Sequence, residues 1–132
     1  MENHILILDG KDFSDLEGFY ETAYDILTKD LDWIVAHNFD ALHDILYGGF
    51  GVYAPQDNVT LKWFRFSKSV KDLGREHSIA YYRERAAVLS GSRAQYFNDK
   101  ASDLEKGEGQ TLIETILEIL SQHKNIELIT LG

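Results

Sequence analysis

The sequence contains no cysteine, and this absence excludes several kinds of site at once. A chain without thiols has no disulfide framework, no zinc–thiolate centre and no cysteine nucleophile. Proline is almost as scarce, because Pro55 is the only one in 132 residues. The sequence also lacks internal repeats and low-complexity linkers.

Long apolar runs are missing as well. The longest stretches of hydrophobic residues are four or five residues, as in Ile5–Leu8. None is long enough to cross a bilayer, and no charged start followed by an apolar run suggests a signal peptide. We therefore expect a cytoplasmic protein with no membrane partner.

The chain does have the composition of a globular protein. It is 44% hydrophobic and 27% charged, which is typical of a folded chain and not of a disordered one. Its length fits a single domain over residues 1–132 that buries one sizeable core.

Negative charge dominates. The formal net charge is −9, and residues 1–60 hold twelve acidic residues against only Lys11 and Lys29. Residues 61–105 are mildly basic, with nine Lys and Arg against six acids. This balance disfavours a nucleic-acid partner and favours a basic protein, because opposite net charge accelerates encounter. A plain role in solubility stays open.

Three apolar segments predict strands separated by helices. Residues 4–8 end at the turn pair Asp9-Gly10, residues 59–65 are rich in strand formers, and residues 126–131 close the chain. Strands joined by helical crossovers predict an α/β fold with a small three-stranded parallel sheet packed with helices.

Helical spacing and capping residues predict the helices. Ser14 with Glu17 forms a capping-box pattern for a first helix that runs to about Lys29. Asn38 is a good N-cap for a second helix, which the Gly48–Gly51 segment ends. Further helices are expected over 67–73 and 112–120. The segment 75–106 fits two more helices with a break near Gly91.

Four polar residues share one face of the second predicted helix. Asp40, His43, Asp44 and Tyr47 stand at i, i+3, i+4 and i+7. Asp40 gains from the helix dipole, but Asp44 gains less, and the two carboxylates repel each other. Three interpretations are open: a solvated face, a metal site, or a pair of anions that enters a cationic pocket of another protein.

Signatures of catalysis are missing. The sequence has no G-x-S-x-G elbow, no phosphate-binding loop and no H-E-x-x-H motif. The other histidines are scattered, and the tyrosines and arginines of 81–96 are better explained by an amphipathic helix than by base stacking. We expect no enzyme activity, no cofactor and no metal.

The segment Asn38–Leu46 resembles the N-L-D-A-L-x-D-x-L motif of the barstar family of intracellular ribonuclease inhibitors. The order of elements around it is similar as well, and the match covers about 1–73 and 107–132. The loop before the motif and position 43 differ, with Trp33-Ile34-Val35-Ala36-His37 and a histidine in place of the family's tyrosines and tryptophan. The helical segment 75–106 is then an insertion.

The resemblance implies a barstar-like fold and stoichiometric inhibition of a basic ribonuclease, as an immunity protein or antitoxin does. In that family, acidic side chains of the second helix occupy the enzyme's phosphate sites. Asp40 and Asp44 match those acids, and the expected contact residues are Asp40, Asp44, His43, Tyr47, Gly48, Trp33 and Asn38. The alternatives are a small enzyme that uses Asp40, His43 and Asp44, and an adaptor with a different protein partner.

The insertion has the wrong charge to dock against a cationic active site. Its arginines Arg83, Arg85 and Arg93 predict that it packs away from the Asp40–Asp44 face. There it is expected to offer a second surface, where identical chains meet through Tyr81, Tyr82 and Tyr96.

Overall fold

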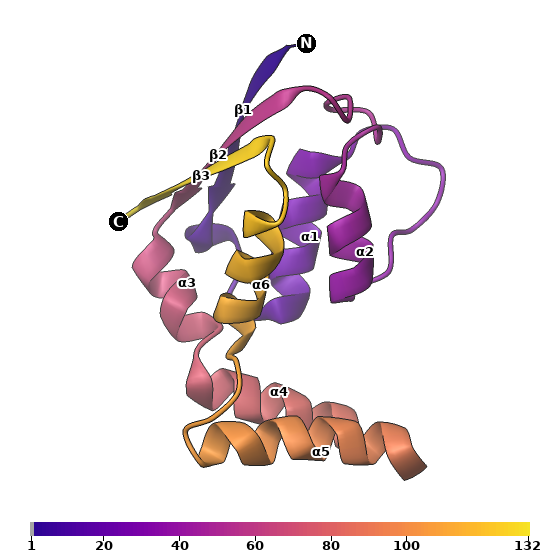
Figure 1. The fold of residues 1–132 in the computed structure, drawn as a ribbon, viewed down its shortest axis with the longest axis vertical. Coiled ribbons are helices and arrows are strands. Elements are labelled where there is room, and N and C mark those ends of the chain that lie inside the picture. Colours follow the sequence, from indigo (N-terminus) through magenta and orange to yellow (C-terminus); the bar gives the residue numbers. More distant parts are fainter. Residues whose placement is uncertain (1) are drawn as a thin grey trace.

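The three strands form one parallel sheet. A computed structural model describes residues 2–132 and shows β1 (Asn3–Asp9), β2 (Asn58–Phe64) and β3 (Ile126–Leu131) in the order β1-β2-β3 (Figure 1). Both strand pairs are parallel. The α/β class and the three-stranded parallel sheet that the sequence predicts are therefore confirmed.

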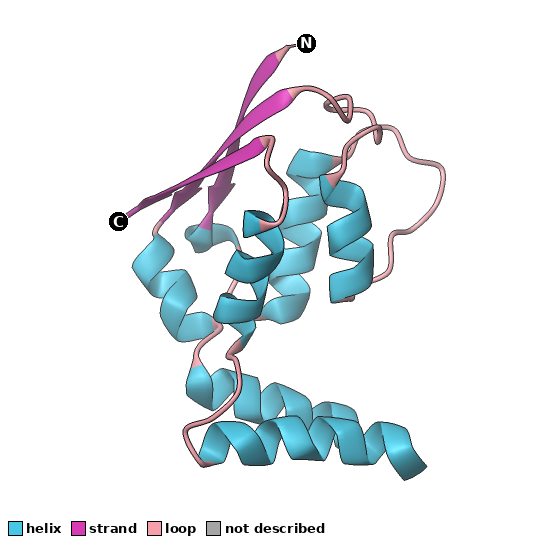
Figure 2. Ribbon diagram, in the orientation of Figure 1, coloured by secondary structure: helices cyan, strands magenta, loops and turns pink. Residues whose placement is uncertain are grey.

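Three helices cover one face of this sheet, and the other face is open (Figure 2). They are α1 (Leu16–Leu27), α2 (Phe39–Leu46) and α6 (Leu112–Ser121). Each has a strongly apolar stripe of buried residues that faces the sheet. This arrangement places α2 at the surface, with only one side against the core.

Strand residues alternate between the two faces of the sheet. Leu8, Leu61 and Trp63 point to the helices and are buried, whereas Ile5 and Ile7 on the open face are 65% and 55% exposed. Trp63 lies in the centre of the core, stacked on Phe19 with ring centroids 5.7 Å apart. Its indole Nε1 donates a 3.0 Å hydrogen bond to Ser69 Oγ on the following helix, so its only polar atom is satisfied.

The first helix begins one residue later than the sequence predicts. Asp15, not Ser14, is the N-cap, and its carboxylate accepts a 2.8 Å hydrogen bond from the Gly18 amide. The capping box proposed for Ser14 is therefore wrong. The helix also ends at Leu27 and not near Lys29, because Thr28 adopts an extended backbone.

The segment 75–106 forms two helices, as predicted. The short 3-10 helix η1 (Gly10–Asp12) follows β1, and helix α3 (Phe66–Asp72) follows β2. After α3 the chain continues into α4 (Arg75–Ala87) and α5 (Gly91–Glu105). These two helices form a hairpin below the other helices (Figure 1). We call this segment the α4–α5 hairpin.

The α4–α5 hairpin is fastened to the rest of the protein. Ser78 Oγ accepts a 2.8 Å hydrogen bond from the first amide of α6, at Leu112. Tyr82, Ala101 and Leu104 are buried in the same apolar cluster as the residues under the sheet. The hairpin is thus an ordered part of the core and not a loose loop.

Candidate protein-binding face

Helix α2 carries the acidic pair, and its local sequence fixes both ends. Asn38 Oδ1 accepts a 2.7 Å hydrogen bond from the Ala41 amide and so caps the first turn, as predicted. At the other end Gly48 has a φ of +90°, and a Cβ there would lie 2.9 Å from the Tyr53 ring. Asn38 and Gly48 therefore define the length of the helix, and Gly48 itself is buried.

Asp40 and Asp44 are both exposed on the outer side of α2. Among residues 2–132, neither carboxylate accepts a side-chain hydrogen bond or forms an ion pair. They stand one turn apart, a spacing that brings neighbouring Cβ atoms to about 6 Å. The helix thus presents two uncompensated negative charges on adjacent turns.

The loop before α2 adds exposed apolar side chains. Trp33 is 54% exposed and Ile34 is 94% exposed. After these residues, Tyr24 Oη donates a 2.9 Å hydrogen bond to the Ala36 carbonyl and so anchors the loop. The ring of Trp33 itself meets Phe50 edge-on at 6.4 Å. An anchored loop with exposed Trp and Ile is a surface that a partner can cover.

Asp44 borders a shallow hollow that this loop and α2 form together. Its lining includes Trp33, Ile34 and Phe50 beside Asp44, within a volume of about 360 Å³. Of the predicted contact residues, Trp33 and Asp44 thus lie side by side. A cationic side chain that reaches Asp44 would pack its aliphatic stem on these rings.

His43 and Tyr47 form a ring cluster with a third residue. His43 Nδ1 and His123 Nε2 are 2.9 Å apart, and Tyr47 Oη lies 3.3 Å from His43 Nε2. The three ring centroids are 4.6 to 5.2 Å from each other. Tyr47 is exposed at the edge of α2, whereas one ring nitrogen of His43 faces inward to His123.

His123 is a functional candidate that sequence reasoning missed. It stands 80 positions from His43 in the chain and is only 3% exposed. Burial, and then the neighbouring His43, lower the pKa of His123 below its ordinary value, so the neutral imidazole is favoured.

The α4–α5 hairpin lies next to Asp40, which contradicts the expectation that it packs away from the Asp40–Asp44 face. Asp40 lines a groove whose far wall is formed by Arg85 and Lys100 of the hairpin. The expectation holds for Asp44, whose hollow contains no hairpin residue. The charge of the hairpin does not decide its position, because buried contacts such as the hydrogen bond of Ser78 to the start of α6 attach it beside Asp40.

The three tyrosines proposed for contact between identical chains are not equivalent. Tyr82 is buried, Tyr81 is partly buried, and only Tyr96 is free at 56% exposure. Tyr82 instead stacks on Phe97 with ring centroids 6.1 Å apart and holds the two helices of the hairpin together.

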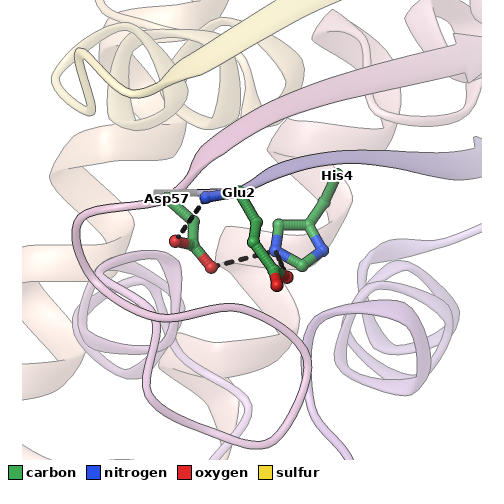
Figure 3. Close-up of side chains that lie close together, drawn as sticks. All are labelled: Glu2, His4 and Asp57. Atoms are coloured by element: carbon green, nitrogen blue, oxygen red, sulfur yellow. Dashed lines mark hydrogen bonds and ion pairs between the residues drawn. The ribbon is translucent and has the colours of Figure 1, made fainter.

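One cluster of three potential metal ligands exists within residues 2–132, and it is not on α2. It consists of Glu2, His4 and Asp57, shown in Figure 3. The Asp57 carboxylate accepts hydrogen bonds from the Glu2 amide at 3.0 Å, the Ala54 amide at 3.0 Å and His4 Nε2 at 2.9 Å. These donors, the two backbone amides first, hold the pKa of Asp57 at about 2.

The hydrogen bonds of this cluster have a structural role, because they join two neighbouring strands. Asp57 stands directly before β2, and β1 pairs with β2 from Asn3 opposite Asn58 onward. The carboxylate therefore ties the start of one strand to the start of the next. Asp40, His43 and Asp44 do not form such a cluster within the described part of the chain.

Comparisons of the chain with family models, with curated proteins and with solved structures give no match. The resemblance to the barstar family thus rests on the Asn38–Leu46 motif and on the order of elements. No helix in residues 2–132 has the length and apolar character needed to span a membrane.

Proposed function

We propose that this protein inhibits a basic ribonuclease, as an immunity protein or antitoxin, by inserting the acidic side of α2 into the enzyme's active site. The observation that carries the proposal is the pair of exposed carboxylates, Asp40 and Asp44, on adjacent turns without partners among residues 2–132. An enzyme that cleaves RNA holds phosphates with Arg, Lys or His, and these groups also bind carboxylates.

The surroundings of Asp44 support a protein partner. Trp33, Ile34 and Phe50 place apolar surface directly beside the charge. Binding energy in protein interfaces concentrates where a charged group is surrounded by aromatic and aliphatic side chains that exclude water. A metal ion would not require this apolar border.

The overall charge supports a basic partner. The net charge of −9 is concentrated in residues 1–60, which contain α2 and the loop before it. A face of one sign raises the encounter rate with an oppositely charged protein.

A small enzyme that uses Asp40, His43 and Asp44 has less support. Asp40 and Asp44 border two different hollows, and a ring nitrogen of His43 is occupied by His123. General acid–base catalysis requires groups that converge on one reacting atom. The capture experiment described next distinguishes a ribonuclease inhibitor from an adaptor with the same fold and another partner.

The test is capture followed by an inhibition assay. The chain, immobilised, is exposed to extract from its source cells, and the eluate is assayed for ribonuclease activity. The purified chain should then abolish the activity of the captured enzyme at an equimolar ratio. A captured protein without ribonuclease activity would indicate the adaptor and contradict the proposal.

Matched variants assign the effect to α2. Asp44→Ala should weaken binding by about 2–5 kcal/mol, because it leaves cationic groups of the enzyme unpaired. Asp103→Ala removes an exposed carboxylate from helix α5, away from α2, and should inhibit like the wild type. Equal inhibition by the Asp44 and Asp103 variants would refute the role of Asp44.

A further inference from the structure

The groove between the α4–α5 hairpin and helices α1 and α2 combines aromatic rings with charges of both signs. Its volume is about 430 Å³, within the range of small-molecule sites. One wall belongs to the hairpin, and the other belongs to α1 and the start of α2. The resemblance to the inhibitor family says nothing about this feature, because the hairpin lies outside the matched residues.

Two cations of the hairpin face this groove without a carboxylate partner among residues 2–132. The Arg85 guanidinium lies 5.6 Å from the centroid of Phe97, and Lys100 Nζ lies 5.7 Å from that of Tyr82. Since the rings of Tyr82 and Phe97 stack on each other, the two cations are held over the same pair of rings. Both cations line the groove.

This arrangement differs from that of two other hairpin cations, Arg75 and Arg83. Arg83 forms an ion pair with Glu105, and the Arg75 Nε donates a 2.9 Å hydrogen bond to the Leu104 carbonyl. Arg85 and Lys100 are held only by ring faces, which attract a cation without neutralising it. Two such cations favour a dianion, because a doubly charged group binds both at once.

The same groove offers surface for a flat ring. Tyr96 is 56% exposed beside Lys100, whose Nζ lies 5.1 Å from the Tyr96 centroid. Tyr81 of the hairpin and Phe39 at the start of α2 add to the aromatic lining. Stacking on such rings is insensitive to the identity of a nucleobase, because every base has a π-face.

The opposite rim of the groove carries hydrogen-bond acceptors. Asp40 is unpaired among residues 2–132, whereas Glu17 on the same side is held by His37 Nδ1 at 2.5 Å. A carboxylate at this rim accepts hydrogen bonds from ring or exocyclic N–H groups. The groove is thus lined by two cations, by several aromatic rings and by an unpaired carboxylate.

We infer that this groove binds a nucleoside monophosphate or a closely similar planar aromatic phosphate. The phosphate lies between Arg85 and Lys100, the ring stacks on Tyr96, and its N–H edge faces Asp40. The inference does not depend on the ribonuclease inhibition proposed above. Because Asp40 borders both, a bound nucleotide would also occupy part of the α2 face.

The test uses the purified chain and four nucleoside 5′-monophosphates, AMP, GMP, CMP and UMP, followed by two-dimensional NMR. Each should give saturable shifts that include the amides of Tyr96, Phe97 and Lys100. Inorganic phosphate and the free nucleosides, as separate probes, should bind at least about tenfold more weakly, since each lacks half of the contacts.

Variants assign the two halves of the site. Arg85→Gln with Lys100→Gln should abolish saturable binding, and Tyr96→Leu should weaken it by about tenfold. Arg93→Gln, which removes an exposed cation of α5 outside the groove, should bind like the wild type. Circular dichroism checks that each variant is folded.

Four results would overturn the inference. One is the absence of saturable shifts with all four nucleotides, and another is wild-type affinity in the double glutamine variant. The third is equal affinity for inorganic phosphate and for the nucleotides, which would show that the rings contribute nothing. Shifts of the wild-type chain that map away from the groove would also refute it, even if a variant failed to fold.

Discussion

His43 on α2 and His123 in the loop before β3 share a hydrogen bond of 2.9 Å between two imidazole nitrogens. Such a bond exists only while at least one of the two facing nitrogens lacks a proton. His123 is buried, and its pKa is lowered by that burial and by His43. The contact therefore links the face of the acidic helix to a buried histidine whose neutral form is favoured.

Because of this contact, we predict that the free energy of unfolding decreases as the pH falls below the ordinary pKa of a histidine. The unfolded chain takes up the proton near pH 6.5, whereas folded His123 takes it up only at lower pH, so acid favours the unfolded state. The contribution is fully present above the unfolded pKa and is lost as pH falls through the folded pKa. Urea unfolding across this range measures it.

The His123→Gln variant should show a flatter dependence of stability on pH in this window. His77→Gln is the matched control, because His77 is exposed on α4 and should leave the slope unchanged. If the slope of the His123 variant equals that of the wild type, the link does not set this pH dependence.

Asp57 should control a separate acid transition. Its pKa of about 2 lies below the ordinary value of 3.8, so its contribution is present above pH 3.8 and is lost as pH falls toward 2. Asp57→Asn places an amide where three donors converge, and we expect a lower melting temperature at neutral pH and a smaller loss of stability in acid. Calorimetry from neutral pH downward checks both, and Asp12→Asn, in η1, serves as control.

Ser69 should matter to stability through one hydrogen bond. Trp63 is fully buried, and its Nε1 donates only to Ser69 Oγ among residues 2–132. Ser69→Ala leaves that N–H buried without an acceptor and should cost about 1–3 kcal/mol of unfolding free energy. Ser67 is exposed and lies two residues before Ser69, so Ser67→Ala should change the unfolding free energy by less than about 0.5 kcal/mol. Denaturant titration of both variants distinguishes them, and equal values would contradict the role of the bond.

Local patterns in the sequence determine much of this fold. The cap at Asn38 and the apolar spacing of α2 depend only on neighbours within one or two turns, and both were predicted correctly. Ser14 and Asp15 are both good N-caps, so local chemistry could not decide between them; the structure uses Asp15. The two helices of the hairpin were also visible in their spacing.

The groups that meet across the chain were not visible in the same way. The contact of His43 with His123 depends on how α6 returns to the sheet, which no local pattern encodes. A signal for the Asp57 cluster did exist, since an acid directly before one parallel strand lies beside the start of its neighbour. The position of the hairpin beside Asp40 depends on its attachment through Ser78. A prediction made from the charge of the hairpin alone therefore placed it on the wrong side of the protein.

The last prediction concerns the rate at which the chain meets its ribonuclease. If the acidic residues of 1–60 steer a basic partner, association should slow about tenfold or more as sodium chloride is raised, because the screening length falls to about 10 Å at 0.1 M. Dissociation should change much less, since contacts already formed at Asp44 are shielded from salt. Stopped-flow mixing with the captured ribonuclease measures both rates. Asp40→Asn should lower the association rate at low salt and lose part of the salt dependence, whereas Asp103→Asn on the hairpin should affect neither strongly. An association rate that is independent of salt would mean that the acidic half serves solubility, and inhibition would then depend on the apolar surface of Trp33 and Ile34.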